Sequence, residues 1–145
     1  MVALSQASSA RATGDDRLGA VFSSDLARAV ETVAIAFEGT ELPRRADPRL
    51  RECNYGDLNG AAVAQLVPRS RFLETPFPGG ESYRDVVERM RDFLADLTPY
   101  EGRRVLIVGH SATRWALEHL LAGRFLEDLV DAPFAWQPGW RYQTP

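Results

Sequence analysis

Apolar residues in this chain occur either in short unbroken runs or in stripes with helical spacing. Four consecutive apolar residues, mostly β-branched, fill positions 105–108 and lead into Gly109 and His110. A run this short, with arginines before it and a glycine after it, predicts a strand over residues 104–109 that is buried on both faces. Residues 18–22 form a second short run of the same kind. Such strands are what a parallel sheet requires.

The helical stripes carry apolar side chains at every third or fourth position and predict three helices, over residues 26–37, 82–97 and 114–121. Ser82 can cap the second helix, and Gly123 can end the third. Residues 68–82 form a loop rich in proline and glycine, and loops of this length are often functional. Strands that alternate with helices predict a single α/β domain over residues 1–145 with a mostly parallel sheet.

Composition narrows the class of protein. The net charge of −3 shows no basic footprint, so nucleic acid is not an expected partner. No apolar run is long enough to cross a membrane or to act as a signal peptide, and Cys53 is the only cysteine, so we expect a cytoplasmic protein in which Cys53 is a small buried residue. All 17 basic residues are arginine, so an anion site must use arginine, histidine or backbone N–H groups.

Three positions are candidates for chemistry. Arg28 lies in the first turn of a predicted helix, where a bound anion would satisfy both the guanidinium and the helix N-terminus; the alternative is a surface pair with Asp25 or Glu31. Glu52 lies in a loop beside apolar residues that could raise its pKa and make it a general acid, unless it is simply solvated. His110 follows a buried strand, and ligand chemistry collects at the carboxyl ends of parallel strands.

Together these segments resemble the histidine phosphatase superfamily, the phosphoglycerate mutase-like group. The resemblance covers the chain from about residue 19 to residue 140 and rests on the order and approximate spacing of four motifs. They are Ser23-Ser24-Asp25-Leu26-Ala27-Arg28-Ala29-Val30-Glu31-Thr32; Leu50-Arg51-Glu52 with Tyr55-Gly56-Asp57 and Gly60; Pro78-Gly79-Gly80-Glu81-Ser82; and Val108-Gly109-His110. The resemblance implies a three-layer α/β/α fold.

The resemblance also implies a site and a reaction. Arg28 corresponds to a phosphate-binding arginine, Glu52 to the proton donor for the leaving group, and His110 to the second histidine, which stabilises the transferring phosphoryl group. Glu81 and Ser82 match a motif near the rim of the phosphate pocket, and we count both among the expected phosphate-binding residues. The implied reaction is hydrolysis of a small phosphorylated molecule, and mutase activity is less favoured. The group uses no metal or other cofactor.

One family feature is missing from the sequence. The family begins with a central strand that ends in Arg-His-Gly, whose histidine is the nucleophile, and no histidine precedes His110 here. We expect no strand before Leu18, and we expect neither His119 nor Cys53 to replace the nucleophile. Three explanations stay open for this N-terminally shortened domain: a longer natural protein, a gap filled by a dimer or by the N-terminal residues, or a rearranged sheet.

The missing nucleophile leaves rival functions open. A non-catalytic module would keep the phosphate pocket and bind without turnover. A structural remnant would associate with its own copy as a homodimer through exposed strand edges. The retained trio of Arg28, Glu52 and His110 favours the enzyme.

Overall fold

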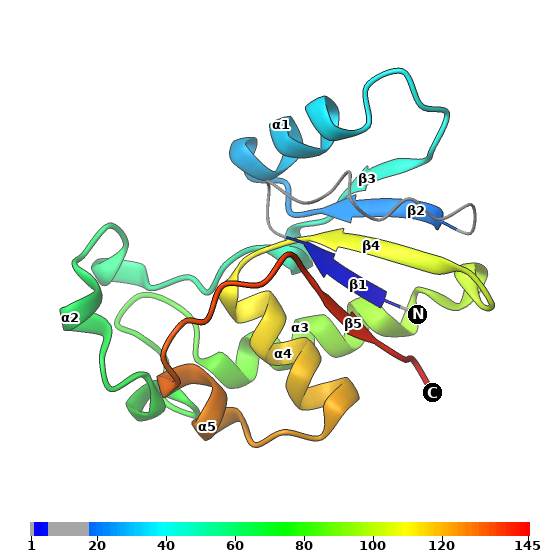
Figure 1. The fold of residues 1–145 in the computed structure, drawn as a ribbon. Coiled ribbons are helices and arrows are strands. Elements are labelled where there is room, and N and C mark those ends of the chain that lie inside the picture. The colour runs from blue at the N-terminus through cyan, green and yellow to red at the C-terminus, as the bar shows by residue number, and fades with distance from the viewer. Residues whose placement is uncertain (1, 6–17) are drawn as a thin grey trace.

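The computed structural model describes residues 2–5 and 18–145 (Figure 1). Its strands are β1 (Val2–Ser5), β2 (Leu18–Ser23), β3 (Arg44–Ala46), β4 (Arg104–Val108) and β5 (Trp140–Tyr142). Its α-helices are α1 (Ala27–Ala36), α2 (Val63–Leu66), α3 (Tyr83–Ala95), α4 (Ser111–Ala122) and α5 (Leu126–Asp131). Short 3₁₀ turns cover Pro48–Leu50, Gly56–Leu58, Arg69–Phe72 and Thr98–Tyr100.

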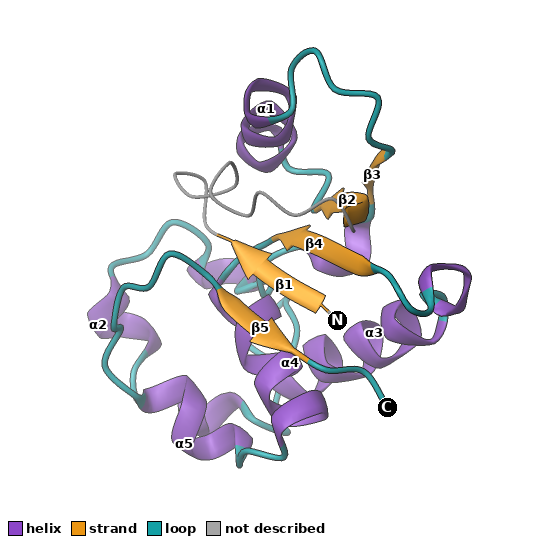
Figure 2. Ribbon diagram, turned by 45° about the vertical axis from the view of Figure 1, so that its right-hand side comes forward, coloured by secondary structure: helices purple, strands orange, loops and turns teal. Residues whose placement is uncertain are grey.

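The strands form one sheet in the order β3-β2-β4-β1-β5. β2 pairs in parallel with both β3 and β4, β1 pairs in parallel with β4, and β5 runs antiparallel to β1. Helix α1 covers one face of the sheet, and α3, α4 and α5 lie on the other (Figures 1 and 2). The predicted three-layer α/β/α fold is confirmed.

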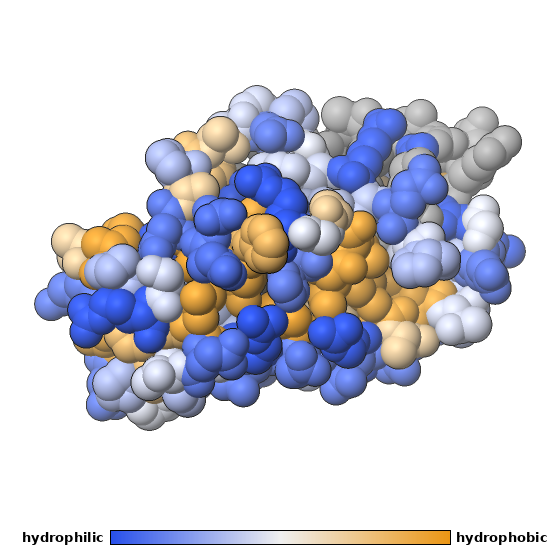
Figure 3. Space-filling view, turned by 90° about the horizontal axis from the view of Figure 1, so that it is seen from below, coloured by the Kyte–Doolittle hydropathy of each residue, from blue (hydrophilic) through white to orange (hydrophobic). Residues whose placement is uncertain are grey.

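Side chains of β4 alternate between two apolar clusters. Val105 and Ile107 belong to the larger cluster, which α3 and α4 cover, whereas Leu106 and Val108 belong to the smaller one under α1. All four are at most 3% exposed, so the prediction of a strand buried on both faces is confirmed. Figure 3 shows the helical side from below, where apolar side chains remain visible between hydrophilic ones.

The three predicted helices form as α1, α3 and α4, and the short helix α5 is an addition that no stripe predicted. Ser82 caps α3 as expected. Helix α4, however, begins at Ser111 and not at Arg114, because the backbone N–H of His110 donates to the Thr113 hydroxyl (3.1 Å) and closes the first turn directly after the strand. None of the helices in the described ranges is long and apolar enough to cross a membrane.

The N-terminal residues also differ from expectation. We expected no strand before Leu18, but Val2–Ser5 forms β1 between β4 and β5. A buried edge of β4 without a partner would leave N–H and C=O groups unpaired, which is costly, so even a four-residue segment is favoured there. N-terminal residues thus pair with β4 at the position where the family's first strand was expected to be missing. The Arg-His-Gly sequence itself is still missing, since Ser5 leads into Gln6.

Candidate functional site

A cavity of about 340 Å³ lies at the carboxyl end of β4. Three segments line it: the first turns of α1, the loop at Glu52, and the turn from β4 into α4. Its lining residues are Arg28, Ala29, Thr32, Glu52, Val108, Gly109, His110 and Ser111. The structure therefore brings Arg28, Glu52 and His110 together, at the sheet edge where ligand sites of α/β proteins usually lie.

His110 is held between two polar side chains. Its Nδ1 lies 3.2 Å from Nη2 of Arg28, and its Nε2 lies 2.7 Å from the hydroxyl oxygen of Ser24. Because a guanidinium can only donate, Nδ1 accepts, and the ring proton is on Nε2 and is donated to Ser24. Burial, with smaller contributions from Arg28 and Arg89, lowers the pKa of His110 to about 4. The imidazole is thus neutral at pH 7.

Glu52 lies at the N-terminus of α4. One carboxylate oxygen accepts from the backbone N–H groups of Cys53 (2.8 Å) and Ala112 (3.1 Å), and the other accepts from that of Ser111 (3.2 Å). Burial raises the pKa of Glu52, although the three N–H groups and the charge of Arg28 oppose this. A buried carboxyl with a raised pKa holds its proton more readily than a solvated one, as a general acid must.

Arg28 lies in the first turn of α1 and is exposed. The alternative of a surface pair with Asp25 does not form, because the Asp25 carboxylate accepts from Nε and Nη2 of Arg51, each at 2.6 Å. The N-cap of α1 is Leu26, which provides no side-chain hydrogen bond to the first N–H groups. Both the guanidinium and the helix N-terminus therefore favour an anion in the cavity.

Glu81 and Ser82 lie beside the cavity region and make structural contacts there. Neither lines the cavity. Ser82 is 2% exposed and caps α3 in a reciprocal pair of bonds with Asp85. Glu81 forms an ion pair with Arg89 (2.9 Å) and accepts from the N–H of Asn54 (2.8 Å). Both residues thus support the loop and the helix beside the cavity, and their role in phosphate binding stays a prediction.

The two other candidate nucleophiles lie outside the site. His119 donates from Nδ1 to the carbonyl of Arg124 (2.8 Å) and accepts at Nε2 from Arg84 (3.3 Å), so both ring nitrogens are used. Cys53 is 3% exposed, and burial together with nearby carboxylates raises the pKa of its thiol, which stays protonated and unreactive. In the ranges that the structure describes, no three metal-ligating side chains form a cluster.

Sequence reasoning missed two contributors to this site, Ser24 and Arg89. Ser24 is fully buried and contacts His110 across 86 positions of sequence. The available signal was that Ser24 directly follows β2, the strand beside β4, so its side chain and His110 share one sheet edge. Arg89 looks like an ordinary polar position on a helix, and nothing in its local sequence indicates its contacts.

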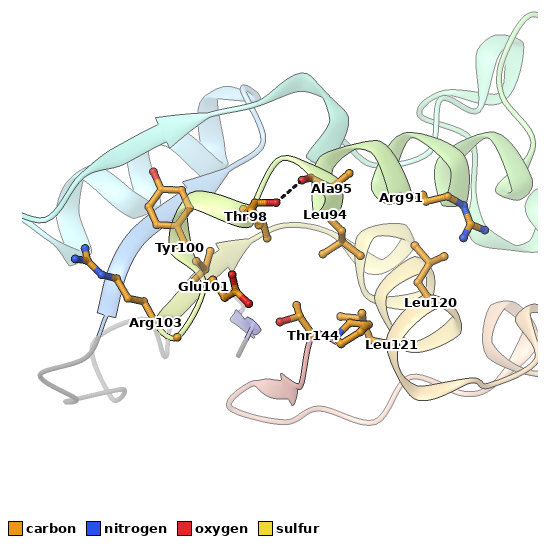
Figure 4. Close-up of a pocket in the computed structure, with 14 residues that line it drawn as sticks. Arg91, Leu94, Ala95, Thr98, Tyr100, Glu101, Arg103, Leu120, Leu121 and Thr144 are labelled. Atoms are coloured by element: carbon orange, nitrogen blue, oxygen red, sulfur yellow. Dashed lines mark hydrogen bonds between the residues drawn. The ribbon is translucent and has the colours of Figure 1, made fainter.

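A second cavity, of about 400 Å³, lies at the amino end of β4 (Figure 4). The ends of α3 and α4 form its walls, with Leu94, Leu120 and Leu121 among the lining side chains. It is larger than the first cavity but is lined by none of the three candidate residues. The three candidate residues are therefore all at the other cavity, at the carboxyl end of β4.

Comparison with known proteins identifies the family. The sequence profile of the histidine phosphatase superfamily (branch 1) matches residues 3–135. A 2,3-bisphosphoglycerate-dependent phosphoglycerate mutase from Methylobacterium sp. (strain 4-46) is 33% identical over 128 residues, covering 78% of this chain and 62% of that protein. A glucosyl-3-phosphoglycerate phosphatase from Mycobacterium tuberculosis (strain ATCC 25618 / H37Rv) is 36% identical over 118 residues, covering 70% and 53%. The chain thus spans little more than half the length of these relatives.

Solved structures agree with this assignment. The mycobacterial glucosyl-3-phosphoglycerate phosphatase Rv2419c in complex with inorganic phosphate superposes with a TM-score of 0.72 at 27% identity, covering 89% of this chain and 82% of that one. Bacillus stearothermophilus YhfR shares the fold, with a TM-score of 0.76 at 22% identity and coverage of 93% and 86%. With its α/β/α layers and the cavity at the end of β4, the chain belongs to the histidine phosphatase superfamily, among phosphoglycerate mutase-like proteins.

Proposed function

We propose that the protein is a phosphatase for small phosphomonoesters, and that the cavity at the end of β4 binds the phosphoryl group. The observation that carries this proposal is the convergence of Arg28, His110 and Glu52 in one cavity. Phosphoryl transfer depends mainly on positioning and on positive charge around the phosphoryl oxygens. The phosphatases among the relatives support the same reaction class.

Each of the three residues has a defined task in this proposal. Arg28 leaves Nδ1 of His110 and donates to the phosphoryl oxygens, together with the first N–H groups of α1. With the anionic phosphoryl group in place of the guanidinium beside Nδ1, the protonated ring is favoured, so His110 takes a proton from water at Nδ1 and donates it in a hydrogen bond to that group, while Nε2 stays bonded to Ser24. Glu52, protonated before the reaction, transfers its proton to the ester oxygen as the P–O bond breaks, and the alcohol leaves neutral.

The nucleophile is the component of the site that the chain itself does not provide. The sequence holds no histidine apart from His110 and His119, and His119 lies outside the cavity. In our proposal the nucleophile is supplied from outside this chain: in an assay of the chain alone, water forms the new bond to phosphorus as the ester P–O bond breaks. The second candidate function is phosphate binding without turnover, which this shortage of histidines favours.

Paired measurements on the same protein test the proposal. Hydrolysis of an aryl phosphate is followed in parallel with calorimetric binding of inorganic phosphate. We expect R28A and H110A each to lower kcat/KM by ~100-fold or more, as the loss of one oxyanion-stabilising donor usually does. Both variants should weaken phosphate binding at least tenfold. R91A is the matched control, because Arg91 forms an exposed pair with Glu88 (3.4 Å) on α3 and does not line the cavity at the end of β4.

The outcomes separate the two functions. Binding that depends on Arg28 and His110 without any hydrolysis would establish the non-catalytic function and reject the enzyme. Hydrolysis that is unaffected by R28A and H110A would place the chemistry elsewhere. Absence of both binding and hydrolysis would reject the phosphate site altogether.

A further inference from the structure

Arg89, in the middle of α3, binds the backbone segment that carries Glu52. Its Nη2 donates to the carbonyl oxygen of Glu52 (3.2 Å), and its Nη1 donates to that of Arg49. Its Nε and Nη2 also donate to the two carboxylate oxygens of Glu81, at 2.9 and 3.1 Å. One guanidinium therefore contacts the chain three residues before Glu52 and at Glu52 itself.

Glu81 extends these contacts to the other side of Glu52. Its carboxylate accepts from the backbone N–H of Asn54 (2.8 Å), and its own N–H donates to the carbonyl of Asn54 (2.8 Å). The close approach of this loop depends on Gly80, because a Cβ there would lie 2.2 Å from the Asn54 carbonyl oxygen. Glu81 and Arg89 thus enclose Glu52 from both directions along the chain.

We propose that Arg89 and Glu81 are positioning residues that hold the carboxyl of Glu52 against the N-terminus of α4. The side chains of Arg89 and Glu81 are only 18% and 27% exposed, and their contact is bidentate, so it is stronger than an ordinary surface pair. The three N–H groups that receive Glu52 belong to Cys53, Ser111 and Ala112. Two of them are on another element, so the carboxyl reaches them only when the loop is fixed.

This inference rests on the proposed role of Glu52 as the acid, and the leaving group provides a selective measurement. A misplaced acid slows departure of a basic leaving group but hardly affects one that leaves without a proton. Phenyl phosphate has a basic leaving group, since phenol has a pKa of ~10 like tyrosine. 2,4-Dinitrophenyl phosphate releases a far more acidic phenol. General loss of structure would slow both substrates alike.

The experiment compares R89M, R89K and E81Q with the wild-type chain and with R91M as a control. We expect R89M and E81Q to lower the ratio of kcat/KM for phenyl over 2,4-dinitrophenyl phosphate by ~10-fold or more, in the direction of E52Q. R91M should leave the ratio within about twofold of wild type. R89K keeps the positive charge but lacks the planar guanidinium that bonds both carboxylate oxygens. We expect R89K to fold at least as well as R89M, but not to return the ratio of the two kcat/KM values to that of the wild type.

A second measurement does not require activity. Carbon-13 NMR of the Glu52 carboxyl follows its titration directly. Burial is the main cause of its raised pKa, so a loosened loop that admits water should bring the pKa back toward its ordinary value in R89M, R89K and E81Q, but not in R91M. An unchanged Glu52 titration in all three variants overturns the inference. Absence of hydrolysis in the wild type rejects only the proposed enzyme, because the NMR titration still decides the positioning.

Discussion

Replacing His110 with glutamine tests the charge state that the structure gives this side chain. Glutamine can still accept from Arg28 and donate to Ser24, but it cannot titrate. In the wild type the pKa of His110 falls from 6.5 to about 4 on folding, chiefly because of burial. Between these two values the unfolded chain binds more protons than the folded one, so the contribution of His110 to stability rises with pH and is lost as the pH falls from 6.5 to 4.

The size of this effect follows from the same numbers. The fall of the pKa from 6.5 to about 4 corresponds to ~3.4 kcal/mol at 1.36 kcal/mol per pH unit. The ring is partly exposed, and solvent screening reduces the electrostatic part, so we expect roughly 1–2 kcal/mol in practice. Below pH 4 the contribution becomes constant, because His110 is then protonated in both states.

Urea unfolding between pH 4 and pH 7, followed by circular dichroism, measures the effect. The carboxylates titrate in both proteins and cancel when the free energy of unfolding of the H110Q variant is subtracted from that of the wild type. This difference should fall by 1–2 kcal/mol as the pH drops from 7 to 4. A difference that stays constant over this range, or that rises as the pH drops, would refute a neutral, buried His110.

Three further substitutions probe the frame of the site by the same unfolding measurement. Ile107→Ala removes a fully buried side chain from β4 and should destabilise the protein by about 2–5 kcal/mol; a loss below 1 kcal/mol would contradict the burial. Ser82→Ala removes the acceptor for the N–H of Asp85 and should cost about 0.5–2 kcal/mol without weakening phosphate binding in calorimetry. Gly80→Ala places a Cβ 2.2 Å from the Asn54 carbonyl oxygen, and we expect a loss of more than ~1 kcal/mol, because backbone must move; an unchanged midpoint would show that the loop adapts freely.

The sequence predicted those elements whose signal is local. The apolar run ending at Val108 indicated a strand buried between two helical layers. The apolar stripe that follows Ser82 indicated α3 with its cap. Both signals are patterns of residues that are close together in sequence. The start of α4 was harder to predict from the sequence. The bond from the N–H of His110 to Thr113 fixes it, and several hydroxyls nearby could have capped the helix instead.

Contacts between distant segments could not be predicted in the same way. β1 is four residues long, too short for a periodic pattern, and the open edge of β4 selects it. Glu81 matched a motif near the pocket rim, but its carboxylate is oriented by the hydrogen bond from Arg89, eight positions later on α3. To predict whether a side chain lies in a site or beside it, one must know which distant residues it contacts, and a single sequence does not show these contacts.

The arrangement of the two helices explains how one cavity can hold an acid and an anion together. α1 and α4 lie on opposite faces of the sheet, and both begin at its carboxyl end (Figure 1). The first N–H groups of α4 are taken by the carboxylate of Glu52, whereas the N-cap of α1 offers no side-chain bond. The N-terminus of α4 stabilises the carboxylate that Glu52 becomes when it gives up its proton, and the N-terminus of α1 favours the phosphoryl group, so the two groups need not compete for the same donors. The sheet thus keeps proton donor and phosphoryl group adjacent but separate, which transfer of a proton to the ester oxygen requires.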